Sequence, residues 1–171
     1  LNPDAPLSPA KKNWFQNRLF RHAVSDLIRR EDLARIAFRS HATPAKGPFA
    51  QGSVWLRPFS ANAPPNAAAI LRSLEAGGFR RDSSGTLRDA QGQAVAFSIA
   101  TNASNRSRMQ MLTLIQADLA RAGITITIAA LDMPSLLERM TKSKQYDAIL
   151  LGLIGVDDDP NHQMNVWLSS S

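Results

Sequence analysis

The feature that most limits the possible folds is an alternation of strand and helix patterns in the second half of the chain. Alternating or β-branched apolar runs predict strands, and apolar spacings of three and four residues predict helices. The elements follow in the order strand, helix, strand, helix, strand at residues 94 to 100, 104 to 122, 124 to 131, 133 to 140 and 146 to 152. Strands joined through helices form right-handed crossovers, so this order predicts an α/β fold with a mostly parallel or mixed sheet flanked by helices.

The first half of the chain has weaker patterns. Residues 17 to 38 carry an apolar stripe at helical spacing, interrupted by the charged run RRED. Residues 41 to 66 are rich in proline, glycine and small polar side chains, which predicts a long irregular loop of the kind that is usually functional or held against another domain. A short helix between prolines and glycines follows at residues 66 to 78, and two turn signals predict a small hairpin at residues 79 to 93.

Composition narrows the classes of protein. A chain of 171 residues with 44% hydrophobic residues predicts one folded domain, and no apolar run reaches the roughly 20 residues of a membrane span. The absence of cysteine excludes disulfides, thiolate metal sites and cysteine nucleophiles. The net charge of +6 comes from dispersed arginines without interleaved aromatics, so no nucleic-acid partner is expected. The chain opens without an initiator methionine or signal peptide, which indicates a piece of a longer protein.

Two segments follow predicted strands and are therefore expected at the same edge of the sheet. TNASNRSR begins at Thr101, and LIGVDDD begins at Leu153. Ligands of open α/β sheets bind outside the carboxyl ends of the strands. The first segment also opens the long helix, so its backbone N–H groups and Arg106 are candidates for contact with an anionic group.

The three consecutive aspartates Asp157 to Asp159 allow three interpretations. With His162 they offer oxygen and nitrogen ligands to a hard cation, but they lack the spaced pattern of a calcium loop. As hydrolytic groups they lack a second carboxylate whose opposed placement can be inferred. Shaping of the loop, with Asp158 or Asp159 capping a following helix, is the third interpretation. The remaining histidines have no ligand spacing, and neither a G-x-S-x-G motif nor a phosphate-binding glycine loop is present, so no catalytic residue, metal or cofactor is predicted.

Four ordered motifs carry a resemblance to a known family. They are FRHAVSDLIRREDLARIAFRSHATPAKGPF, PPNAAAILRSLEAGGF, MLTLIQADLARAGITITI and YDAILLGLIGVDDDPN. Their order resembles that of the family 5 solute-binding proteins of bacterial ABC importers, the dipeptide- and oligopeptide-binding group, over about residues 13 to 170. The resemblance implies that residues 1 to 171 form one lobe of a two-lobed protein with a fold like the type II periplasmic binding proteins.

The same resemblance implies a function without chemistry on the ligand. The lobe would close with the other lobe over a peptide or small solute by hinge motion, and the closed form would dock on an ABC permease in the membrane. The expected location is periplasmic or extracellular, with membrane association through the importer. A carboxylate- or metal-dependent hydrolase domain that uses Asp157 to Asp159 is the alternative.

The last motif departs from the family pattern at two positions. The tryptophan and aspartate that commonly line the cleft of peptide binders correspond to Leu153 and Val156, and Asp157 lies one residue later. Peptides, sugars and other small solutes therefore all remain open as ligands. The residues expected to bind the ligand are Thr101, Asn102, Asn105, Arg106, Leu153, Gly155, Val156 and Asp157.

Overall fold

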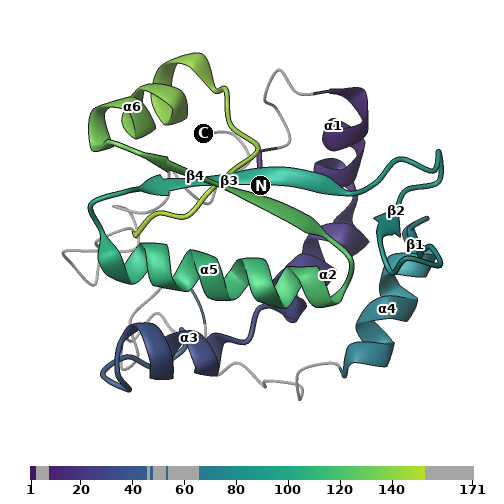
Figure 1. The fold of residues 1–171 in the computed structure, drawn as a ribbon, viewed down its shortest axis with the longest axis horizontal. Helices are drawn as coiled ribbons and strands as arrows, with labels where there is room; N and C mark the ends of the chain where they lie inside the picture. The colour runs from purple at the N-terminus through teal and green to yellow at the C-terminus, as the bar shows by residue number, and fades with distance from the viewer. Residues whose placement is uncertain (3–7, 46, 48–52, 54–65, 153–171) are drawn as a thin grey trace.

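The computed structural model describes residues 1–2, 8–45, 47, 53 and 66–152. In chain order the elements are α1 (Pro9–Gln16), α2 (Arg18–Leu27), α3 (Arg30–Ala37), α4 (Ala67–Ala76), β1 (Arg80–Arg81), β2 (Leu87–Arg88), β3 (Ala96–Asn102), α5 (Arg106–Arg121), β4 (Thr125–Leu131), α6 (Met133–Glu138), the π-helical turn η1 (Arg139–Ser143) and β5 (Ala148–Ile149). Figure 1 shows α5 running alongside the strands, with α6 beyond the end of β4. The predicted α/β class is confirmed.

The described strands of the main sheet are all parallel, in the order β4-β3-β5. β3 pairs with β4 along its whole length, from Ala96 opposite Thr125 to Asn102 opposite Leu131. β5 pairs with β3 at only two positions, Ile99 with Ala148 and Ala100 with Ile149. The carboxyl ends of the three strands consequently meet at one edge of the sheet, on the left-hand side of Figure 1.

The N-terminal segment with the helical pattern, residues 17 to 38, forms two helices instead of one. α2 ends at Leu27, and α3 begins at Arg30, because Ile28 and Arg29 leave the helical conformation. The backbone N–H of Arg29 donates to the carboxylate of Asp118 on α5 at 3.0 Å instead of to a helix carbonyl. The helix α1 before them was not expected, since Trp14 and Phe15 are its only buried residues and give no repeating apolar stripe.

Most of the remaining elements confirm the sequence-based boundaries. The short helix α4 and the β1–β2 hairpin are present, and Gly123 follows α5 with a positive φ of 84°, as expected of a residue that ends a helix. The last strand is shorter than predicted, and the helix that begins at Met133 changes from α to π geometry after Glu138. Most of the predicted loop at residues 41 to 66 lies outside the described residues.

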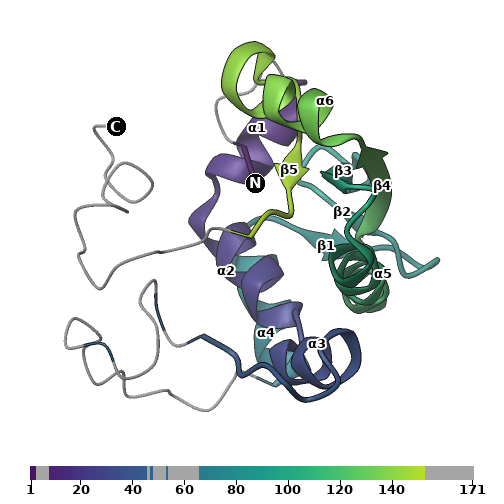
Figure 2. The ribbon, with the colours of Figure 1, turned by 90° about the vertical axis from the view of Figure 1, so that its left-hand side faces the viewer.

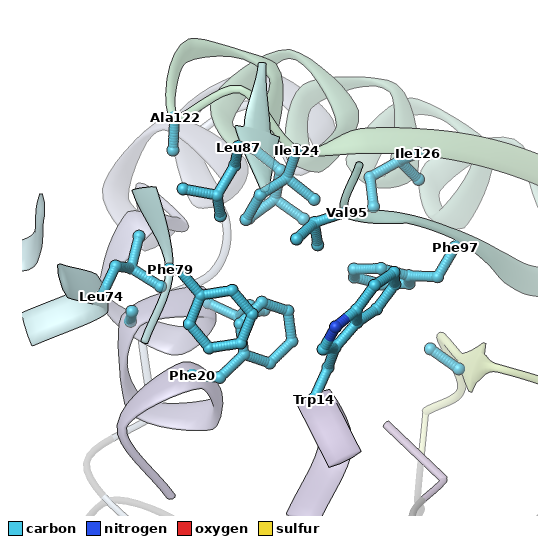
Figure 3. Packing of buried hydrophobic residues seen from close by; sticks show 14 of the residues in the cluster. Trp14, Phe20, Leu74, Phe79, Leu87, Val95, Phe97, Ala122, Ile124 and Ile126 are labelled. Carbon is cyan, nitrogen blue, oxygen red and sulfur yellow. The ribbon is translucent and has the colours of Figure 1, made fainter. Parts of the chain in front are cut away.

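The core joins the N-terminal helices to the sheet through aromatic side chains. Phe15 and Phe20, from α1 and α2, pack against Phe97 of β3 with ring centroids 5.3 and 6.4 Å apart. Phe79, ahead of the hairpin, stacks on Phe20 at 5.0 Å. Figure 3 shows the rings of Phe20, Phe79, Phe97 and Trp14 below the aliphatic side chains of Leu87, Val95, Ile124 and Ile126. This core holds the sheet, and therefore its carboxyl edge, in a fixed relation to the helices.

Candidate functional site

The candidate site is the carboxyl edge of the sheet, where β3 turns into α5, β4 turns into α6, and the chain leaves β5. Figure 2, seen from the left-hand side of Figure 1, views this edge. The backbone N–H of Ala103 donates to the carbonyl oxygen of Leu131 at 2.7 Å, so the pairing of β3 with β4 extends one residue into the turn. The two turns are therefore held side by side.

Thr101 and Asn102, at the end of β3, make internal hydrogen bonds. Thr101 is fully buried, and its hydroxyl donates to the carbonyl oxygen of Leu150 at 2.8 Å. The Oδ1 atom of Asn102 accepts from the backbone N–H of Ser104 at 3.1 Å and from its hydroxyl at 3.0 Å. Thr101 thus ties β3 to the end of β5, whereas Asn102 shapes the turn into α5.

Asn105 and Arg106, the other two predicted residues in this segment, lie at the start of α5. Asn105 is the N-cap, and its Oδ1 atom accepts from the backbone N–H of Arg108 at 2.9 Å. The Arg106 side chain is exposed and makes no hydrogen bond or ion pair with another described residue. Among these four predicted residues, Arg106 therefore has the cationic group that is free to meet a ligand.

Arg108 is a residue at this edge that the sequence analysis did not select. Its guanidinium lies over the backbone of Gly152, since a Cβ built on that glycine would be 3.2 Å from an Arg108 terminal nitrogen. Within the described part of the chain it has no carboxylate partner. The signal for it in the sequence is its place in the first turn of a helix that follows a strand, two residues after Arg106. Two cations consequently border the edge.

Asp132, between β4 and α6, places a carboxylate at the same edge. It caps α6, accepting from the backbone N–H and the hydroxyl of Ser135, both at 2.8 Å. These two hydrogen bonds hold the pKa of Asp132 below its ordinary value, so it is ionised at neutral pH. Its oxygen atoms already have partners, whereas the side chains of Arg106 and Arg108 make no hydrogen bond or ion pair with another described residue.

Asp147, just before β5, is a second residue that the sequence analysis did not select. Its buried carboxylate accepts from the backbone N–H of Ser98 at 2.7 Å, from the Ser98 hydroxyl at 3.0 Å and from Lys11 Nζ at 2.8 Å. The sequence signal that could have identified Asp147 is a carboxylate directly before an apolar strand, in the segment YDAILLG. It joins α1, β3 and β5.

The predicted ligand-binding residues Leu153, Gly155, Val156 and Asp157 lie outside the described residues, as do Asp158 and Asp159. In the described ranges, no group of three or more histidine and acidic side chains is arranged to hold a metal ion. None of the helices described is long and apolar enough to cross a membrane.

Comparison with known sequences gives the family. The sequence model for "Bacterial extracellular solute-binding proteins, family 5 Middle" matches residues 1–171, which is the whole chain. The chain belongs to this family. Family 5 proteins bind solutes and are not enzymes, so the match gives no support to the hydrolase alternative.

Individual relatives of this family 5 chain are longer proteins. A probable ABC transporter-binding protein of Deinococcus radiodurans is 28% identical over 152 residues, which cover 85% of this chain and 26% of the relative. Di/tripeptide-binding protein 4 of Pseudomonas aeruginosa is 43% identical over 56 residues, 33% of this chain and 10% of the relative. The family 5 chain therefore corresponds to about a quarter of the length of the first relative.

A solved structure shares the fold of this family 5 chain. The oligopeptide-binding protein AppA of Bacillus subtilis, determined in complex with a nonapeptide, superposes with a TM-score of 0.78 at 20% identity. The match covers 90% of this chain and 31% of AppA. The predicted resemblance and the predicted fold are thereby both confirmed.

Proposed function

We propose that residues 1 to 171 form one lobe of a two-lobed solute-binding protein that captures peptides or related small solutes for an ABC importer. The observation that carries this proposal is the family match over the whole chain. The lobe works with the rest of a longer chain in the periplasm or outside the cell, and the loaded protein docks on a membrane permease.

The carboxyl edge of the sheet is the proposed ligand-binding surface of this lobe. Arg106 and Arg108 offer cationic groups there, and the Nδ2 atoms of Asn102 and Asn105 make no hydrogen bond with another described residue. Cations and amide donors suit carboxylates and carbonyl oxygens, the groups in which peptides are rich. Peptides are the favoured ligand class because a relative named as a di/tripeptide-binding protein is 43% identical over 56 residues.

Leu153, Gly155, Val156 and Asp157 are proposed to contribute from the segment that follows β5. Asp157 is the proposed partner of a ligand cation, such as the free α-amino group of a peptide. Leu153 and Val156, in place of the tryptophan and aspartate of the family pattern, make sugars and other small solutes the second candidate class.

A thermal-shift screen of the longest natural chain containing this segment tests the proposal. The panel contains dipeptides, tripeptides, longer peptides, sugars and divalent ions. A solute at about a hundredfold its dissociation constant stabilises the folded state by about 2.7 kcal/mol, which raises the melting temperature by several degrees. Stabilisation by peptides supports peptide capture, and stabilisation by sugars alone assigns the second class. A response to metal ions alone contradicts solute capture.

Two arginine variants test the location of the site. Arg106→Ala removes the free guanidinium at the sheet edge and is expected to weaken binding of a carboxylate-bearing peptide by about tenfold, which corresponds to one charge-assisted hydrogen bond. Arg80→Ala is the matched control, since Arg80 is also exposed but lies on the hairpin strand β1. Equal affinities of both variants would contradict a ligand contact at Arg106.

A further inference from the structure

β5 has too little backbone pairing to define its own register. Two residue pairs join it to β3. A slip of one residue moves every side chain of a strand to the opposite face, and short ladders resist such a slip weakly. Other contacts must therefore fix where this strand lies and where the chain leaves the sheet after it.

Side-chain hydrogen bonds extend the pairing beyond both ends of β5. Ahead of the backbone pairs, the Asp147 carboxylate accepts from the backbone N–H of Ser98 at 2.7 Å. After them, the Thr101 hydroxyl donates to the carbonyl oxygen of Leu150 at 2.8 Å. Both side-chain pairs have the sequence separation of 49 residues that also relates Ile99 to Ala148. Four consecutive positions thus share one register.

Both of these hydrogen bonds are shielded from water. Thr101 is 0% exposed and Asp147 is 5% exposed. A slip of one residue would leave a buried hydroxyl and a buried carboxylate without these partners. The free-energy cost of such a slip is larger than that of losing two hydrogen bonds at the surface. Lys11 Nζ, 2.8 Å from the Asp147 carboxylate, supplies the opposite charge that a buried carboxylate needs. The register is therefore set by side chains as much as by the backbone.

We propose that Ser98, Thr101 and Asp147 are positioning residues that fix the register of β5 and, through it, the point at which the chain leaves the carboxyl edge of the sheet, the proposed ligand-binding surface. The proposal rests on the proposed function. It changes the role of Thr101 from the ligand contact expected from the sequence to a residue that acts through the Leu150 backbone. Arg108, which lies over Gly152, continues this fixation to the last described residue of the segment.

Thr101→Val in the longest natural chain is the central test, because valine keeps the buried shape and removes the hydroxyl donor. Hydrogen exchange of the Leu150 amide, which donates to the Ala100 carbonyl at 2.9 Å, reports the register without any ligand. We expect this exchange to accelerate about tenfold relative to the Leu87 amide in the hairpin. Affinity for trialanine, measured by calorimetry, is expected to fall about tenfold as well.

Two variants serve as controls for this test. Thr101→Ser keeps the hydroxyl and is expected to recover most of the Leu150 protection and of the affinity. Thr127→Val makes the same replacement at an exposed position of β4 and is expected to change neither. If Thr101→Val unfolds the protein, Ser98→Ala provides a milder change, since it removes the hydroxyl bond to Asp147 and keeps the backbone one.

The outcomes separate this inference from the proposed function. Loss of affinity with unchanged Leu150 exchange would overturn the positioning role and make Thr101 a ligand contact. Unchanged exchange and unchanged affinity would also overturn it. If the wild-type protein binds none of the peptides of the screen, trialanine included, peptide capture is contradicted, whereas accelerated Leu150 exchange in Thr101→Val still supports the fixation of β5.

Discussion

Gly123, between α5 and β4, combines a positive φ with a close backbone contact. Its φ is 84°, and a Cβ would overlap the Gly85 carbonyl oxygen and lie 2.6 Å from the Leu87 backbone nitrogen. Leu87 also donates its N–H to the Gly123 carbonyl at 2.9 Å, so the two segments cannot separate without losing this bond. We expect Gly123→Ala to lower the free energy of unfolding by about 3 kcal/mol, measured by urea denaturation.

Gly92 provides the matched control for Gly123. Its φ is similar at 79°, but a Cβ there would meet no atom within 4 Å. Gly92→Ala is therefore expected to lower the free energy of unfolding by only about 1 kcal/mol, the effect of the backbone conformation alone. Equal effects of the two substitutions would show that the contact with the hairpin contributes nothing.

At the residue scale, the candidate site residues were predicted from their position after a strand. The burial and hydrogen bonding of each side chain were not predicted. Thr101, Asn102 and Asn105 follow the predicted strand at residues 94 to 100, as ligand-binding residues of this fold class do, although Thr101 and Asn102 are the last two residues of β3 in the structure. Capping by Asn105 is local, since its partner Arg108 is three residues away, whereas burial of the Thr101 hydroxyl depends on the path of β5, which no local pattern encodes. Asp147 was missed for the same reason, because its partner Ser98 is 49 residues away.

The junction of α2 and α3 depends on a buried carboxylate from another element. Asp118 of α5 is 2% exposed and accepts from the backbone N–H and Nε of Arg29 and from Arg121. Asp118→Ala leaves the N–H of Arg29 without this partner and is expected to lower the free energy of unfolding by about 3 kcal/mol in urea denaturation. Arg121→Ala removes only an exposed partner, so a loss below about 1 kcal/mol is expected. A small effect of Asp118→Ala would refute this role.

The hairpin of β1 and β2 contains a carboxylate, Asp82, that makes the stability of the fold depend on pH. The Ser84 hydroxyl, followed by Arg88 and by backbone N–H groups, holds the pKa of Asp82 well below its ordinary value of 3.8. A lowered pKa in the folded state stabilises the fold above that ordinary value, and the stabilisation is lost as pH falls below it. The melting temperature of Asp82→Asn should therefore lie below that of the wild type at pH 6, with a difference that shrinks toward pH 3.

Asp26→Asn is the control for the substitution itself. Asp26 is exposed on α2 and makes no hydrogen bond with another described residue. The melting temperature of this variant at pH 6 is expected to match that of the wild type. A difference between Asp82→Asn and the wild type that stays constant from pH 6 to pH 3 would contradict the role of the Asp82 carboxylate.

At the element scale, strongly periodic segments were predicted well and short ones were not. α5 and β4 follow from long apolar patterns, and their boundaries agree with the prediction within two residues. α1 has two buried residues and no repeat, and β5 has two paired residues within a longer apolar run. Such short elements are stabilised by tertiary contacts: α1 packs in the aromatic core, and the hydrogen bonds of Asp147 hold β5.

At the scale of the whole molecule, the order of the elements is what the sequence determines most directly. The alternation of strands and helices predicted a parallel sheet, and β3, β4 and β5 do end at one edge of that sheet. The four ordered motifs predicted the family of the protein. Ligand identity was not predictable, because the proposed two-lobed protein binds its ligand with groups from both lobes, and this chain corresponds to only 26% of its Deinococcus relative.

Closure over the ligand is the prediction that belongs to the whole molecule. If this lobe forms one wall of a cleft, a solute that contacts both lobes stabilises the closed arrangement by its differential affinity for it. The longest natural chain should then show a smaller radius of gyration in solution scattering when a stabilising peptide is added. Arg106→Ala should need about tenfold more peptide for the same compaction, because the sheet-edge cation is lost. Compaction that is identical in Arg106→Ala, or absent in the wild type despite a thermal shift, would mean that the ligand binds without bringing this edge against a second lobe.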